Sequence, residues 1–143
     1  MLRYGNVYGP RQDPFGEAGV IAIFTAQMLA GQAVTINGSG EQERDFVYVG
    51  DVVRANLRAL ETGDGQAFNI GAGEGTTVNQ IFGLLKEATG STLDATHAPA
   101  KAGETFRIYL NITKAARGLG WLPEVSLRDG LTQTVESLRP STA

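Results

Sequence analysis

The sequence of 143 residues predicts a single domain of the mixed α/β class. Short apolar segments with strand composition alternate with segments whose apolar residues recur at helical spacing. The chain contains 19 glycines, and most of them fall between these segments, which is typical of many tight turns. Strands and helices mixed in this way favour an α/β or α+β architecture.

The first half of the chain is expected to begin with a strand and to end with a helix. Its predicted elements are a strand at residues 2–7, a helix at 20–29, strands at 34–36 and 45–49, and a helix capped by Asp51. Gly9-Pro10 closes the first strand, while Gly31 and Gly63 end the two helices.

The second half continues the alternation of extended and helical segments. Its predicted elements are a strand at 67–70, a helix begun by a Thr77–Gln80 capping box, extended segments at 92–98 and 106–110, a helix at 113–119 and a last helix capped by Ser126. We expect residues 140–143 to be a frayed tail.

Composition excludes several classes of function. The chain has no cysteine, which rules out disulfide frameworks, thiolate zinc sites and cysteine nucleophiles. A single histidine, His97, rules out a multi-histidine metal site, so we expect no metal. The net charge of −3 is a poor footprint for nucleic acid or an anionic membrane. No apolar run approaches about 18 residues, so we expect no membrane span and a cytoplasmic protein.

One glycine-rich turn, Gly71-x-Gly73-x-Gly75, imitates a dinucleotide-binding fingerprint between a strand and a capped helix. Asp94 follows near the position where such folds hold a ribose. The spacing is wrong, however, because the third glycine comes one residue too early. We therefore interpret this segment as a plain turn at a helix start, where an anion could still bind on general grounds.

Arg44 stands between a glycine-containing turn and an apolar strand. Its guanidinium could present a fork of donors to a phosphate or a carboxylate. The alternative is a surface pair between Arg44 and Asp45, with Asp51 as an ordinary helix cap and the face of Asp51, Arg54 and Arg58 solvated. Both interpretations stay open on the residues alone.

Two further polar features have a functional and a structural interpretation. Asn6 lies near the end of the first strand, where its side chain could hydrogen-bond a ligand at the carboxyl edge of a sheet. The alternative is that Asn6 only forms the turn. The loop 99–104 contains one cation, Lys101, and one acid, Glu104. Taken alone, that loop is a solvated connection.

Several motifs in order resemble the extended short-chain dehydrogenases/reductases, in particular the NAD-dependent epimerase/dehydratase family and its UDP-glucose 4-epimerase-like enzymes. The matching segments are residues 2–11, residues 34–52 with Arg44-Asp45-Phe46-Val47-Tyr48-Val49, residues 68–73, and Leu119-Gly120-Trp121-x-Pro123. The similarity runs over essentially the whole chain. Each motif alone is modest, but the set in this order is highly specific.

The resemblance is to the C-terminal, substrate-binding half of that family. It implies one sugar-nucleotide-binding domain at residues 1–139 that lacks most of the Rossmann sheet and keeps a remnant strand at 2–7. The family's glycine-rich NAD fingerprint does not occur here. Its Tyr-x-x-x-Lys pair is also missing, because no tyrosine is followed four residues later by a lysine. NAD is the cofactor of the full-length family. For this chain we expect no bound cofactor and no catalytic residue.

The resemblance also assigns roles to individual residues. Asn6 and Arg44 would contact the substrate diphosphate, and Gly19 and Val20 would start the helix nearest to it. Tyr4 would lie where the strand passes the nicotinamide, while backbone groups of Val34 and Ile36 would contact the base. Lys101 would contact a phosphate and Glu104 the ribose. Lys101 stands where the family usually has arginine, and a lysine makes no bidentate fork. Glu104 replaces an aspartate, and Gly5 replaces a common aromatic residue.

The function expected from the resemblance is substrate binding in a sugar-nucleotide epimerase, without turnover by these 143 residues alone. A dehydratase fragment, a non-catalytic nucleotide-sugar module and a self-associating module are the alternatives, and UDP and dTDP stay open. We also expect a homo-oligomer formed through residues 2–8 or the helix 20–29, because an open strand edge is a template for pairing.

Overall fold

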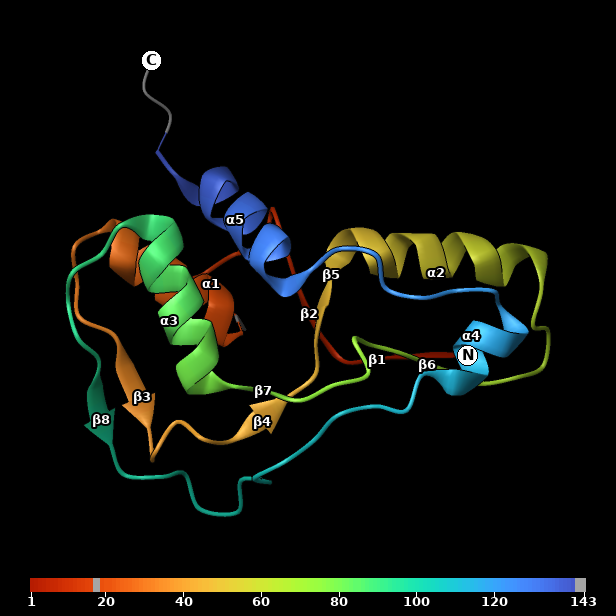
Figure 1. Ribbon diagram of the computed structural model, residues 1–143, viewed down its shortest axis with the longest axis horizontal. Coiled ribbons are helices and arrows are strands. Elements are labelled where there is room, and N and C mark those ends of the chain that lie inside the picture. The colour runs from red at the N-terminus through yellow and green to blue at the C-terminus, as the bar shows by residue number, and fades with distance from the viewer. Residues whose placement is uncertain (17–18, 141–143) are drawn as a thin grey trace.

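The computed structural model describes residues 1–16 and 19–140 and confirms the mixed α/β class (Figure 1). The helices are α1 (Val20–Leu29), α2 (Val49–Glu61), α3 (Val78–Thr89), α4 (Thr113–Gly118) and α5 (Leu127–Leu138). The strands are β1 (Leu2–Tyr4), β2 (Asn6–Tyr8), β3 (Thr35–Asn37), β4 (Glu43–Arg44), β5 (Phe46–Tyr48), β6 (Phe68–Ile70), β7 (Thr76–Thr77) and β8 (Thr96–Ala98). Figure 1 shows α1, α3 and α5 gathered on one side of the molecule, and α2 and α4 on the other.

The strands pair two by two. β1 pairs with β6, β2 with β5 and β3 with β8, all in parallel, whereas β4 and β7 are antiparallel. The single strand expected at residues 2–7 is wrong in detail, because the chain changes partner at Gly5. The amide of Gly5 donates to the carbonyl of Ile70, and the next amide, of Asn6, donates to the carbonyl of Asp45. A Cβ on Gly5 would lie 2.7 Å from that Asp45 carbonyl oxygen, so a larger residue would push the strands apart.

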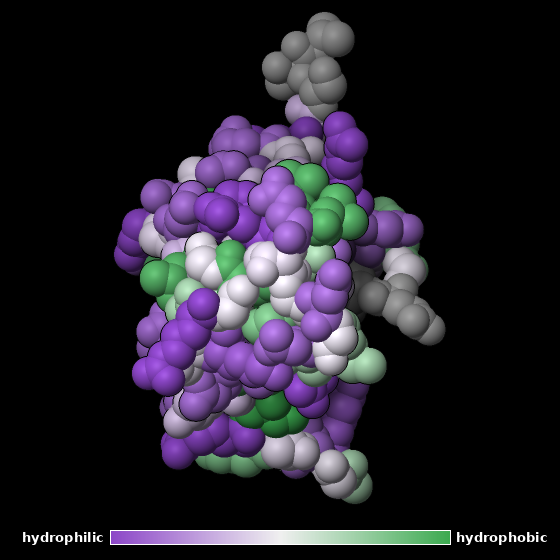
Figure 2. Space-filling view, turned by 90° about the vertical axis from the view of Figure 1, so that its right-hand side faces the viewer, coloured by the Kyte–Doolittle hydropathy of each residue, from purple (hydrophilic) through white to green (hydrophobic). Residues whose placement is uncertain are grey.

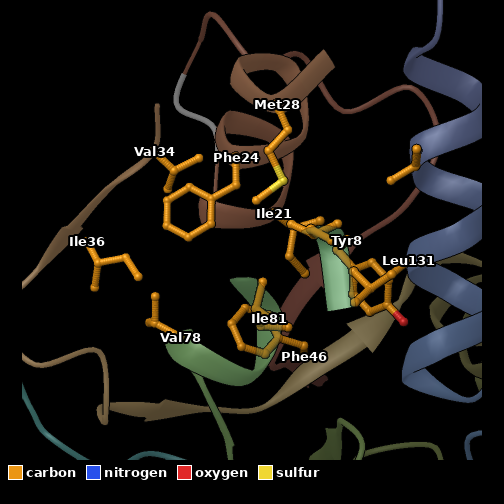
Figure 3. Packing of buried hydrophobic residues seen from close by; sticks show 12 residues of the cluster. Tyr8, Ile21, Phe24, Met28, Val34, Ile36, Phe46, Val78, Ile81 and Leu131 are labelled. Atoms are coloured by element: carbon orange, nitrogen blue, oxygen red, sulfur yellow. The ribbon is translucent and has the colours of Figure 1, made fainter. Parts of the chain in front are cut away.

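The first hydrophobic cluster lies between α1, α3 and α5 (Figure 3). Its buried members are Tyr8, Ile21, Phe24, Met28, Val34, Ile36, Phe46, Val78, Ile81, Leu85, Leu131 and Val135. Figure 3 shows Val34, just before β3, and Ile36 of β3 reaching toward Phe24 and Val78. The helix expected at residues 20–29 is confirmed, and Ile21, Phe24 and Met28 face this cluster rather than solvent.

Local sequence signals mark where the helices of this cluster begin and end. The Thr77 hydroxyl accepts from the Gln80 amide at 3.0 Å, and the Gln80 side chain accepts from the Thr77 amide at 2.8 Å. This capping box begins α3, and Gly90 ends the helix with φ 75°, a conformation that favours glycine. Ser126 caps α5 by accepting from the Asp129 amide at 3.1 Å.

The second hydrophobic cluster joins α2 and α4 to the strands. Its buried members are Val47, Val52, Ala55, Phe68, Ile70, Ala115, Leu119 and Trp121. Trp121 is fully buried, and its indole N–H donates to the Asp51 carbonyl at 2.9 Å. The loop before α5 is therefore fixed onto α2 by an aromatic side chain that satisfies its one polar atom.

Asp51 corrects two expectations. It does not cap α2, which begins two residues earlier at Val49, and it is buried rather than part of a solvated face. Its carboxylate accepts from the amides of Glu124 and Val125 at 3.1 Å and from Arg54 at 2.8 Å. The two amide contacts come from residues more than 70 positions away in sequence, so they are invisible to local pattern.

An apolar stripe lies on the outward side of α2. Val53, Leu57 and Leu60, hereafter the α2 stripe, recur at helical spacing and are 52%, 59% and 83% exposed. Figure 2 views the side of the molecule on which α2 ends, and there green apolar side chains interrupt a mainly purple surface. None of the helices in residues 1–16 and 19–140 is both long and apolar enough to cross a bilayer.

Candidate functional site

A pocket of about 320 Å³ lies between the start of α1, the strand β3 and the loop that follows β8. It is lined by Val20, Ile23, Phe24, Thr35, Asn37, Gln42, Val78, Lys101 and Glu104. The residues from α1 and α3 make one side apolar, while those from β3 and the loop make the other side polar. Such a mixture suits a ligand with both an apolar face and hydrogen-bonding groups. We call it the α1 pocket.

Arg44 lies beside the α1 pocket, where it pairs with the lining residue Glu104. Its guanidinium donates to the Glu104 carboxylate at 3.3 Å and to the Glu43 carbonyl at 2.7 Å. The Arg44 side chain is 17% exposed and that of Glu104 is 32% exposed, so the pair is partly shielded from water. A cation held in this way at the edge of a pocket is available to a phosphate or a second carboxylate.

Asp45 does not pair with Arg44, contrary to one of the two interpretations of the sequence. It is 1% exposed, and its carboxylate accepts from the amides of Ala72 at 2.6 Å, Gly73 at 3.1 Å and Leu110 at 3.2 Å. These bonds satisfy a buried charge that would otherwise be costly. Asp45 therefore ties together three separate segments directly beside Arg44.

The same contacts explain the glycine-rich turn at residues 71–75. Two of its amides already point at the Asp45 carboxylate, and a Cβ on Gly71 would lie 2.5 Å from an Asp45 carboxylate oxygen. The turn is thus folded around an internal anion and does not fit the pyrophosphate of a dinucleotide. These bonds agree with the interpretation of the segment as a plain turn at a helix start.

Four of the residues singled out in the sequence meet at or beside the α1 pocket. Val20, Lys101 and Glu104 line it directly, and Arg44 is bonded to Glu104. Gly19 immediately precedes α1 and caps it without a side chain, so its backbone is exposed there. Residues from distant segments of the chain are therefore brought to one place.

Val34 and Ile36 contribute differently from the pocket-lining residues. Their side chains are buried in the first cluster, 2% and 1% exposed, and the Val34 carbonyl already accepts from the Thr96 amide at 2.9 Å. Their neighbours Thr35 and Asn37 line the pocket instead. Successive strand residues point to opposite faces, so this alternation was the signal that could have identified Thr35 and Asn37.

Asn6 and Tyr4 do not line the α1 pocket. Asn6 is exposed at the start of β2, opposite Phe46 in the parallel ladder. The Tyr4 ring is 46% exposed, and its hydroxyl donates to the Asn56 side chain on α2 at 3.0 Å. Both residues thus face solvent on the strands, outside the lining of the α1 pocket.

Gln42 is a pocket residue that sequence reasoning missed. Its side-chain amide donates to the Asn37 carbonyl at 3.1 Å, which fixes the turn between β3 and β4. Nearby, Glu43 forms an ion pair with Arg107, joining β4 to the segment after the loop 99–104. Gln42 lies just outside β4, so strand alternation does not place it, and its contact with Asn37 becomes visible only in the folded chain.

Other chemistry is sparse in the part of the chain that the structure describes. That part contains no group of three histidine, aspartate or glutamate residues placed to hold a metal. Burial raises the pKa of the Tyr8 phenol above its usual range, with smaller contributions from the nearby Asp51, Tyr48 and Asp129. Tyr8 is therefore a neutral hydroxyl at physiological pH.

Comparison with known proteins gives consistent relatives. Residues 1–71 match the NAD dependent epimerase/dehydratase family. A putative UDP-glucose 4-epimerase from Methanocaldococcus jannaschii is 49% identical over 139 residues, which cover 97% of this chain and 45% of that protein.

Solved structures agree with the sequence relatives. The crystal structure of a UDP-glucose 4-epimerase with UDP-glucose from Thermotoga maritima is 59% identical with a TM-score of 0.94, covering 96% of this chain and 45% of that one. A UDP-glucose 4-epimerase from Thermus thermophilus in complex with NAD is 41% identical with a TM-score of 0.87. The match covers 99% of this chain and 46% of that one.

The chain spans a little under half the length of these relatives, and the similarity extends well past residue 71. Identities of 41% to 59% are high enough for the fold and the family to be shared. The chain therefore belongs to the NAD dependent epimerase/dehydratase family, within the extended short-chain dehydrogenases/reductases.

Proposed function

We propose that this chain is the substrate-binding half of an NAD-dependent sugar-nucleotide epimerase, with a UDP-sugar as its ligand. The observation that carries the proposal is the meeting of Arg44, Lys101 and Glu104 at the α1 pocket. Two cations beside a half-apolar pocket suit a molecule that joins a diphosphate to a flat base. The similarity to an epimerase solved with UDP-glucose supports the same ligand class.

Each residue at the pocket would contact a different part of the ligand. The Arg44 guanidinium provides charge-assisted donors for the diphosphate, and Lys101 adds a second, more mobile cation. Glu104 holds Arg44 in position and offers a carboxylate oxygen to a ribose hydroxyl. The apolar side chains of Val20 and Phe24 provide the surface against which the base packs.

Other assigned residues would act at the edges of this arrangement. The exposed side chain of Asn6 would donate to the diphosphate. The backbone of Gly19 at the start of α1 would approach the same group, and backbone groups of Val34 and Ile36 would read the base. The exposed ring of Tyr4 is the one group that we assign to the nicotinamide.

Bound NAD would supply a hydride acceptor for a carbon of the sugar and return the hydride afterwards. The residues of this chain would bind and orient the nucleotide sugar for that exchange. UDP-glucose 4-epimerase homologues favour epimerisation over the dehydratase alternative. We expect the protein to act in the cytoplasm.

The 143-residue chain with added NAD should not interconvert UDP-glucose and UDP-galactose. The reason is local: none of its tyrosines is followed four residues later by lysine, and its glycine-rich turn is folded around Asp45. A coupled assay of sugar interconversion checks this expectation. Turnover above a no-protein control would contradict it.

The binding part of the proposal is tested by calorimetry with UDP. A charge-assisted contact contributes about 1.5–3 kcal/mol, so Arg44→Ala should weaken UDP binding about tenfold or more. The control is Arg58→Ala, which removes an exposed arginine from α2 and should leave the affinity unchanged. Equal affinities for wild type and Arg44→Ala would remove Arg44 from the site. Repeating the titration with dTDP decides between the two nucleotides.

For assembly, we propose a two-fold dimer, the commonest closed symmetry. Of the two contacts expected from the sequence, residues 2–8 stay a candidate, because β1 has β6 on one side only among the described strands. The helix α1 is less suited, since Ile21, Phe24 and Met28 are buried within the chain. The α2 stripe provides the exposed apolar surface that α1 lacks.

A further inference from the structure

A larger groove, of about 620 Å³, lies at the other end of the molecule between β6 and α4. It shares no lining residue with the α1 pocket. Asn69 enters it from β6 because its strand neighbours Phe68 and Ile70 point into the second cluster. Lys114 and Arg117 enter it from one face of α4, while Ala115 on the other face is buried. This side of the molecule faces the viewer in Figure 2.

The groove is positively charged in a protein of net charge −3. No acidic residue lines it, and neither Lys114 nor Arg117 forms an ion pair within residues 1–16 and 19–140. The parallel register sets Arg3 of β1 directly beside Asn69, so the exposed Arg3 lies on the same face of the sheet. Three cations therefore gather here without a carboxylate partner in the described chain.

The hydrogen bonds within the groove occupy its acceptors, so the groups left for a ligand are mainly donors. The Asn69 side-chain amide donates to the Asn111 carbonyl at 3.2 Å, and the Asn111 side-chain oxygen accepts from the Thr113 amide at 2.9 Å. The amide hydrogens of Asn111 and the hydroxyl of Thr113 are left beside Lys114 and Arg117 for a ligand. A ligand that satisfies this set must carry several acceptor atoms and negative charge.

Lys114 is also positioned by an aromatic ring. Its ammonium lies 5.2 Å from the centre of the Phe68 ring, a cation–π contact that limits how far this flexible side chain can swing. Phe68 is itself closely packed, since a Cβ on Gly118 would lie 2.6 Å from its ring. One of the cations is thus held over the groove by the core beneath it.

We propose that this groove is a second anion site, which binds the phosphoryl group of a small phosphorylated molecule. Phosphoryl oxygens are strong acceptors, and their negative charge would pair with the cations of Lys114, Arg117 and Arg3. The proposal does not depend on the function of the α1 pocket. A ligand bound here would contact the edge of the β1–β6 pair and α4.

The test is an NMR titration of the 143-residue chain with inorganic pyrophosphate. We expect saturable shifts of the backbone amides of Asn69, Asn111 and Lys114, and the same shifts with UDP but not with uridine. Shifts with UDP alone would mean that the nucleoside, and not the phosphoryl group, is recognised, which would overturn the proposal. Shifts confined to the α1 pocket, or no saturation at any amide, would overturn it as well.

A double variant, Lys114→Gln with Arg117→Gln, tests the charges themselves. Both side chains lie at the surface, so the fold should be kept, and pyrophosphate binding at the groove should weaken at least about tenfold. Arg58→Gln is the matched control and should change nothing. Arg44→Ala should leave the groove shifts intact, so failure of the α1 pocket and failure of the groove are told apart. Unchanged affinity in the double variant would contradict the assignment.

Discussion

The two hydrophobic clusters differ in how completely the chain covers them. Around the first, α1, α3 and α5 pack against one another, and their apolar residues face inward. Around the second, α2 covers the strands with one face and exposes the α2 stripe on the other. The first region is thus closed and contains the α1 pocket, whereas the second offers a surface suited to another polypeptide.

Leucine truncation in each region measures this difference most strongly. Leu85 is fully buried in α3, so Leu85→Ala should cost about 2–5 kcal/mol of the free energy of unfolding. Leu57 is 59% exposed on α2, so Leu57→Ala should change that free energy by less than about 0.5 kcal/mol. Urea unfolding of the two variants checks the comparison. Equal losses would mean that α2 is as enclosed as α3.

Outside the two clusters, Asp45 ties its own segment to two distant segments, so its removal should also cost stability. In Asp45→Ala the three amides of Ala72, Gly73 and Leu110 lose their acceptor, which should cost about 3 kcal/mol. Asp64→Ala, an exposed aspartate on a loop, is the control and should have little effect. The measurement is again denaturant unfolding. A loss below about 1 kcal/mol for Asp45→Ala would show that water replaces the carboxylate.

The smallest expected effect on stability, but a clear one on assembly, is that of Leu57→Lys. If the α2 stripe contributes to the dimer contact, a charge at its centre should give a monomer without changing the free energy of unfolding by more than about 0.5 kcal/mol. Light scattering at micromolar concentration checks both proteins. A wild-type monomer would contradict the proposed assembly, and a dimeric Leu57→Lys would exclude the stripe from its contact.

The sequence predicted features that depend on local chemistry. The helix at residues 20–29, the Thr77–Gln80 capping box and the Ser126 cap all follow from contacts within a few residues. The strands near 34–36 and 67–70 were found within a residue or so, because apolar runs between turns are a local signal. The family resemblance was equally a matter of order and spacing along the chain.

Long-range contacts were beyond such reasoning. Asp51 reads as a helix cap, yet its partners lie at Glu124 and Val125, and Asp45 reads as a partner for Arg44 but is bound by amides 27 to 65 residues away. The change of strand partner at Gly5 has the same origin. At the site, the charged residues were recognisable by type, whereas Thr35 and Asn37 required the strand alternation that fixes which side faces the pocket.

A crystal structure of the chain with UDP is the decisive experiment for the proposal that the α1 pocket binds a nucleotide diphosphate. We predict the diphosphate against the Arg44 guanidinium, near Lys101, with the base beside Val20 and Phe24. UDP bound only elsewhere, for example on the glycine-rich turn at residues 71–75, would show that the α1 pocket is not the nucleotide site.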